Sequence, residues 1–141
     1  MILVDVAQHL VAGGPWVEGS TTYPVRYNVT TDIQDPDTDV SEDAQIVLAT
    51  FIPPGKQKRA MGGHLVRENA GLRVIVRGPK FDPENAVAMA QQVYEYLDGT
   101  SVTINTREHW FEILHAPVLD EQDRNGRWKV FIRFKVLREQ G

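Results

Sequence analysis

The chain contains no cysteine among its 141 residues. Disulfide bonds, thiolate metal sites and cysteine nucleophiles are therefore excluded, which favours a reducing compartment or indifference to redox conditions. No apolar run approaches the roughly 18 residues that a membrane-spanning helix needs, so we do not expect a membrane protein. The first residues, MILVDVAQHLVAGG, lack the basic start of a signal sequence, and we interpret them as a helix of the mature protein.

Motifs of catalysis and of cofactor binding are also missing. The GKS or GKT of a phosphate-binding loop and the GxSxG of a serine hydrolase do not occur. Glu108 and Glu112, four residues apart on a predicted strand, lie about 13 Å apart, too far for a glycosidase pair. We therefore expect neither an enzyme nor a cofactor.

Two patterns that resemble metal sites fail on inspection. The four histidines, His9, His64, His109 and His115, stand at no metal-ligand spacing, and we predict structural or surface roles for them. Alternate acidic residues at 35–43 have the spacing of a calcium loop. However, Val40 stands where that loop needs glycine, and Ile46 stands where it needs glutamate. No metal site is predicted.

Length and charge are those of an ordinary folded domain. A chain of 141 residues with 42% hydrophobic and 24% charged residues fits one domain, which we place at 1–141. An acidic loop is expected at about 32–43 and a basic loop at about 53–63. The formal charge of −4 does not favour a diffuse nucleic-acid-binding surface.

Two helices are predicted. Apolar residues at helical spacing, closed by Gly13-Gly14-Pro15, indicate an amino-terminal helix. Its apolar residues are Ile2, Leu3, Val6, Leu10 and Val11. A longer helix at about 82–98 begins with the capping residue Asp82 and with Pro83, and Gly99 suits its end. Its apolar stripe consists of Ala86, Ala90, Val93, Tyr94 and Leu97.

The remaining patterned segments predict strands. Residues 23–29 form a possible edge strand, 44–52 a buried strand ended by Pro53-Pro54-Gly55, and 72–77 an alternating strand. A strand from Arg107 ends at Pro117 and joins the strand 127–137 through a turn at Asn125-Gly126, which makes a hairpin. The predicted fold class is α+β: a mixed, largely antiparallel sheet packed by both helices, with a carboxyl-terminal hairpin.

The last strand has the clearest alternation in the chain. One face carries Trp128, Val130, Ile132, Phe134 and Val136, and the other carries Arg127, Lys129, Arg133 and Lys135 with Phe131. Arg73 and Arg77 place cations on one face of the strand at 72–77. The cationic face has three interpretations that the sequence leaves open. It is a solvated face that discourages edge pairing, an interface complementary to acidic loops such as 32–43, or a nucleic-acid surface.

Three ordered segments carry a family resemblance. They are GLRVIVRG at 71–78, DPENAVAMAQQVYEYLDG at 82–99 and RNGRWKVFIRFKVL at 124–137. In this order they resemble the tail terminator, or tail completion, proteins of long-tailed bacteriophages, which are often labelled minor tail or minor capsid proteins. The match covers most of the chain after Ala44, and the acidic insertion at 32–43 departs from the family pattern.

The resemblance implies a virion structural protein made in the host cytoplasm. Such a protein forms a ring, usually a hexamer, that caps the tail tube, stops its polymerisation and presents a surface to the head connector. Its expected partners are further copies of itself, the tail tube protein and head-tail connector proteins, and we do not expect direct nucleic-acid binding. A connector or adaptor component is an alternative, and a nucleic-acid-binding module is another. Candidate interface residues are Lys56, Lys58, Arg59, Arg73, Arg77, Arg127, Lys129, Arg133 and Lys135.

Overall fold

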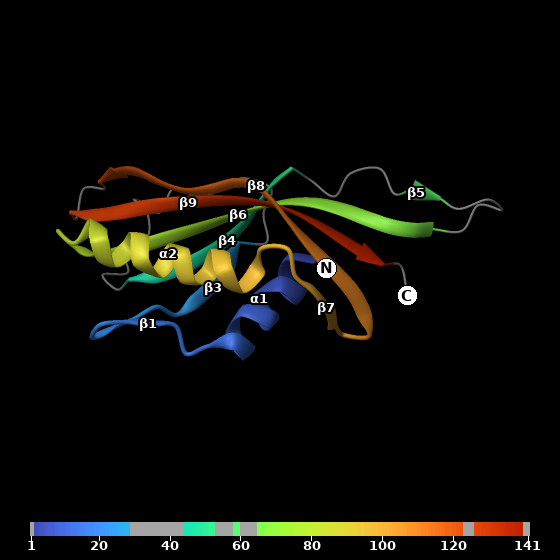
Figure 1. Cartoon of the computed structure of the whole chain (residues 1–141), viewed down its shortest axis with the longest axis horizontal. Coiled ribbons are helices and arrows are strands. Elements are labelled where there is room, and N and C mark those ends of the chain that lie inside the picture. The colour runs from blue at the N-terminus through green and yellow to red at the C-terminus, as the bar shows by residue number, and fades with distance from the viewer. Residues whose placement is uncertain (1, 29–43, 53–57, 60–64, 123–125, 140–141) are drawn as a thin grey trace.

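The computed structural model describes residues 2–28, 44–52, 58–59, 65–122 and 126–139. Two helices, α1 (Ile2–Gly13) and α2 (Pro83–Leu97), lie on the same face of a sheet (Figure 1). The strands are β1 (Val17–Glu18), β2 (Thr21–Thr22), β3 (Val25–Asn28), β4 (Gln45–Ile52), β5 (Lys58–Arg59), β6 (Leu65–Lys80), β7 (Ser101–Ile104), β8 (Arg107–Gln122) and β9 (Arg127–Glu139).

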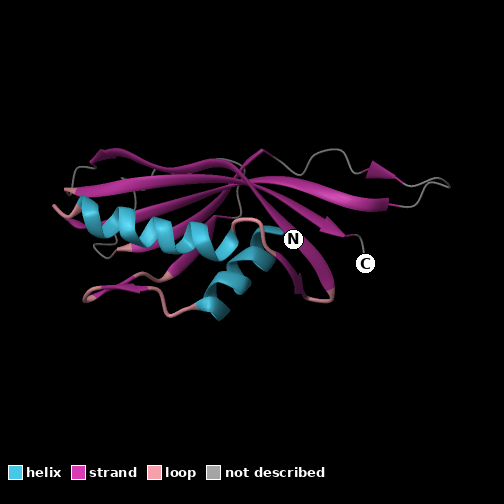
Figure 2. Cartoon of the chain, viewed as in Figure 1, coloured by secondary structure: helices cyan, strands magenta, loops and turns pink. Residues whose placement is uncertain are grey.

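The main sheet has the strand order β3-β4-β6-β9-β8-β7, and β5 pairs with β6. Within the described segments β3 and β4 run parallel, and the other neighbouring strands run antiparallel. Strands β1 and β2 form a separate short ribbon. Figure 2 shows the two helices against one layer of strands. The α+β prediction, with a mixed, largely antiparallel sheet and a final hairpin, is confirmed.

Helix α2 begins and ends as its sequence predicts. The Asp82 carboxylate accepts a hydrogen bond from the backbone N–H of Asn85, and Pro83 follows as the first helical residue. At the other end Gly99 has φ +66°, the left-handed conformation that glycine adopts at little cost. The buried stripe is Ala86, Met89, Ala90, Val93 and Leu97, so Met89 replaces the partly buried Tyr94 of the predicted stripe.

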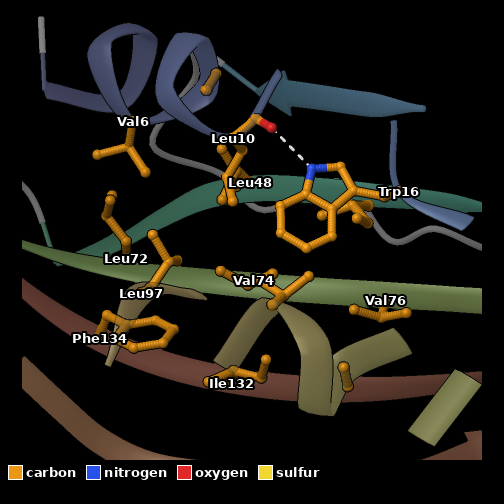
Figure 3. Packing of buried hydrophobic residues seen from close by; sticks show 14 of the residues in the cluster. Val6, Leu10, Trp16, Leu48, Leu72, Val74, Val76, Leu97, Ile132 and Phe134 are labelled. Carbon is orange, nitrogen blue, oxygen red and sulfur yellow. Dashed lines mark hydrogen bonds between the residues drawn. The ribbon is translucent and has the colours of Figure 1, made fainter. Parts of the chain in front are cut away.

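The core lies between the helices and the first face of the sheet, which we define as the face carrying Leu72, Val74 and Val76 (Figure 3). Val130, Ile132, Phe134 and Val136 of β9 are buried on this face beside them, which confirms the predicted register. Helix α1 adds Leu3, Val6, Ala7 and Leu10. The indole N–H of Trp16 donates to the carbonyl of Leu10 at 2.7 Å and so ties the chain after α1 to the helix end.

Several boundaries differ from the sequence prediction. Strand β8 continues past Pro117 to Gln122, because an unpaired strand edge needs no N–H at that position. Strand β6 begins at Leu65, and β5 places Lys58 and Arg59 in a short strand inside the predicted basic loop. Val11 is exposed although the predicted apolar stripe includes it. The acidic segment 32–43 lies outside the described residues.

Candidate assembly surface

The second face of the sheet, which carries no described helix, is not a uniform cationic surface. Arg77, Arg127 and Lys129 are buried, with 0%, 6% and 4% of their surface exposed. The expectation that these three cations line an exposed face is therefore wrong. Alternation shows that they share a face, but it cannot show whether that face meets solvent. Ile75, two residues before Arg77 and on the same strand face, is apolar and buried. An apolar residue among the cations was the sequence signal that part of this face is covered.

The cations that remain accessible form one compact group. Arg133 is exposed, and Arg73 and Lys135 are partly exposed. Lys135 lies opposite Glu112 of β8, which places an acid beside it. Lys58 and Arg59 pair with β6 through their backbones, and Lys56 lies outside the described residues. Among the predicted interface cations that remain accessible, Arg73 and Arg133 are thus the two that lie directly opposite each other in the sheet.

A row of basic side chains crosses three strands on the second face. Arg73 of β6 lies opposite Arg133 of β9, and Arg133 lies opposite His115 of β8. We call these three residues the basic row. Partial burial lowers the pKa of Arg73, the nearby charge of Arg133 lowers it further, and Asp120 opposes the change. Two like charges are therefore held side by side at a site that is partly shielded from water.

An aromatic platform and a hollow accompany the basic row. The Arg73 guanidinium carbon lies 5.2 Å from the centre of the Phe131 ring, a cation–π contact. The neighbouring row of the sheet continues from Phe131 to Val118 of β8. Together the basic row, Phe131, Val118 and Asp120 line a hollow of about 390 Å³. This volume suits one or two side chains of a partner.

Strand β8 has an open edge beside this hollow. Strand β7 pairs with β8 only between Arg107 and Trp110, and the Phe111 N–H donates to the Thr100 carbonyl. Beyond that point no described strand covers β8. Its exposed large apolar residues are Leu114, Val118 and Leu119, at 50%, 42% and 43% of their surface. We call these three residues the β8 apolar edge. Apolar groups along an open strand edge favour a contact with another polypeptide.

The open edge is irregular, which limits what can pair with it. Three register shifts separate β8 from a regular ladder with β9, at Ile113/His115, His115/Val118 and Leu119/Gln122. At each shift β8 contains one residue more than β9, which is the pattern of a β-bulge. Pro117 also removes one N–H from this segment. Such an edge resists indiscriminate strand addition, so a partner must match its side chains.

A second group of charged residues is buried at the other end of β8 and β9. Arg138 donates to the Asp5 carboxylate at 3.2 Å, and the Asn105 amide donates to the other Asp5 oxygen at 2.8 Å. His109 lies opposite Arg138 in the ladder, and its Nε2 is 3.4 Å from Asp5. Burial lowers the pKa of His109. The group joins α1 to the sheet. It was not predicted, because helical spacing shows Asp5 only as a polar position of α1.

The histidines of the described segments take structural or surface positions. The His9 ring stacks on Tyr96 at 4.8 Å between ring centres, and burial lowers the pKa of His9. His109 is buried and His115 is exposed, while His64 lies outside the described residues. The described residues hold no group of three or more His, Cys, Asp or Glu side chains arranged for a metal ion.

No protein-family model matches the chain, and no curated protein sequence matches it. Among the described residues there is also no helix with the length and apolar character that a membrane crossing requires. Two features remain that bear on function: the resemblance of three sequence segments and the geometry of the second face of the sheet.

Proposed function

We propose that this protein is a bacteriophage tail terminator: copies of it form a closed ring that caps the tail tube, and the ring offers a surface to the head connector. The observation that carries the proposal is the β8 apolar edge. It leaves three large apolar side chains exposed on an edge that no described strand covers. Contact with another copy would remove these side chains from water.

Ring closure follows from a contact between two different surfaces. A head-to-tail contact repeats around an axis and closes when the rotation between copies divides a full turn. The open end of the sheet at β8 and the opposite end at β3 are different surfaces, as such a contact requires. Growth of the tube ends at the ring if the outward face of the ring matches no further tube subunit.

The proposed role is structural rather than catalytic. One support is that the segments 71–78, 82–99 and 124–137 resemble tail terminator proteins. The other is the bulged edge of β8, which would pair only with a partner of matching shape. A nucleic-acid surface gains less support, since Arg77, Arg127 and Lys129 are buried and Asp120 lies in the hollow. A head-tail connector component is the alternative. It would use the same contact between copies, but it would bind portal-side proteins and not the tail tube.

Tail length is the decisive test. Phage particles assembled without this protein should carry tails of abnormal or unregulated length in negative-stain images, because nothing caps the tube. Tails of normal length would refute a terminator role. Purified protein should be captured by tail tube subunits, whereas capture by portal-side proteins alone would favour the connector alternative.

A matched pair of substitutions tests the surface. Leu119→Ser on the β8 apolar edge should abolish the ring in light-scattering measurements of assembled protein. Val87→Ser provides the control, because Val87 is a similarly exposed residue on α2 at 41%. Equal loss of the ring in both variants would contradict the assignment of the contact to β8.

A further inference from the structure

A second apolar surface lies away from the β8 apolar edge, at the other end of the strand order. It is a groove of about 310 Å³ between α1 and β3, which we call the α1–β3 groove. Figure 1 shows the far part of β8 along the upper margin of the molecule and α1 with β3 on its lower side. The groove is lined by Val4, Ala7, Gln8, Val11, Ala12 and Val25.

Helix α1 carries more apolar surface than its own core uses. Leu3, Val6 and Leu10 bury the side of the helix that faces the sheet. Val4 and Val11, seven residues apart, lie on a neighbouring flank and line the groove; Val4 is partly exposed and Val11 is 61% exposed. A helix that packs on one sheet needs a single apolar stripe. The additional flank is the part that a partner would remove from water.

Charged residues accompany both apolar surfaces, with opposite signs and on the same face of the sheet. Val25 pairs with a buried core residue of β4 and so lies on the first face, which puts the exposed Arg26 on the second face. Leu119 lies opposite a buried core residue of β9, again on the first face. The exposed Asp120 lines the hollow on the second face. Each end of the sheet therefore has an apolar residue on the first face and a charge on the second.

We propose that the α1–β3 groove receives the β8 apolar edge of a second copy of this chain, with Leu119 in the groove and Asp120 beside Arg26. This inference rests on the proposed ring and names the surface that completes its contact. The contact joins two different surfaces, so it is head-to-tail and repeats around an axis. The pairing of opposite charges fixes its register. Asp120 also lies near Arg73 of its own chain, and an exposed carboxylate has lone pairs for a second cation.

Engineered cysteines test the contact directly. The chain has no cysteine of its own, so a disulfide forms only where thiols are introduced. Two full-length variants with different tags, Leu119→Cys and Val11→Cys, are mixed and oxidised. A product that carries both tags is expected, because a disulfide needs Cα atoms within about 7 Å. Val87→Cys mixed with Leu119→Cys is the control, since Val87 is an exposed valine of α2 outside the groove, and it should give no such product.

The crosslinking outcomes distinguish the possible occupants of the groove. Absence of a product with both tags would overturn the proposal. A disulfide between two Leu119→Cys chains would overturn it in favour of a symmetric contact of β8 with β8. A third result against it is that a tail tube subunit with an introduced cysteine crosslinks to Val11→Cys, whereas the Leu119→Cys variant does not.

Charge reversal tests the register of the contact. Arg26→Glu and Asp120→Lys should each weaken association between copies by about tenfold, because each places like charges together. The two changes in one chain restore an attractive pair and should recover most of the loss. Lys80→Glu is the control, since Lys80 is an exposed cation of β6 that lines neither surface. Light scattering over a concentration series measures association, and thermal melting shows that each variant keeps its fold. A double variant as weak as the two single changes combined would remove the pairing of Arg26 with Asp120.

Failure of this inference is distinguishable from failure of the proposed function. If the product with both tags forms but phage tails keep normal length without the protein, the contact between copies stands and the terminator role fails. If tails are unregulated without the protein and the product does not form, the terminator role stands and this contact fails.

Discussion

The buried pair His109–Arg138 and the exposed pair His115–Arg133 have the same chemistry and different surroundings. Both join β8 to β9 across one ladder. Helix α1 covers the first and brings Asp5 to it, whereas the second lies beside a hollow and an open edge. A cationic pair therefore becomes part of the protein's framework or part of its surface according to what packs over it.

Burial of the first pair costs free energy of desolvation, and the exposed second pair incurs little of this cost. Taking charges out of water costs free energy unless a partner and hydrogen bonds compensate. Asp5, Arg138 and Asn105 compensate one another within this group. Arg133 is exposed to solvent, which removes most of this cost. The two pairs should therefore respond differently to mutation: the stability of the fold should depend on the first pair far more than on the second.

The largest expected contrast comes from one substitution made at two positions. Arg138→Gln leaves the buried Asp5 carboxylate without its cation and should lower the free energy of unfolding by about 3 to 5 kcal/mol. Arg133→Gln should change it by less than about 0.5 kcal/mol, as is usual for surface positions. Urea denaturation of both variants measures the difference. Similar losses in the two variants would remove the distinction between framework and surface.

A smaller effect is expected from pH. Burial holds the pKa of His109 below its ordinary value, whereas the unfolded chain protonates near that value, about 6.5. As pH falls below about 6.5 the unfolded state binds the proton first, so stability declines with acidification. In His109→Gln this part of the decline should disappear. Denaturation midpoints measured between pH 7 and pH 5 test this, and an unchanged slope in the variant would contradict it.

The smallest effect concerns the aromatic platform of the exposed pair. Phe131 lies under Arg73, and such a contact is worth about 0.5 to 1 kcal/mol at an accessible site. A double-mutant cycle with Arg73→Met and Phe131→Leu should give a coupling of that size in the free energy of unfolding. A coupling of zero would mean that Phe131 does not position Arg73.

Sequence patterns predicted the elements with strong local signals. Helix α2 was recognisable from Asp82, Pro83 and Gly99, because capping and helix termination depend on neighbouring residues. The register of β9 was recognisable from its alternation. The length of β8 and the short strands β5 and β7 were not predicted, because these strands depend on pairing with segments elsewhere in the chain.

The candidate site was predictable only in part. Arg73 and Arg133 were named from the sequence, together with Arg77, Arg127 and Lys129, which proved to be buried. No sequence signal distinguished these two groups except the apolar residue Ile75 among the cations. His115 joined the row because a bulge after Ile113 moved it to the second face, and a bulge is not visible in strict alternation.

By itself, the sequence determined which residues share a strand face and where α2 begins and ends, since both follow from backbone geometry over a few residues. Only the tertiary structure decided which face is covered, which edge stays open and which histidine–arginine pair is buried against Asp5. Asp5 and Arg138 are 133 positions apart in the chain, and their contact exists only because α1 packs against the end of β8 and β9. Burial is set by such distant contacts, and local periodicity does not record them.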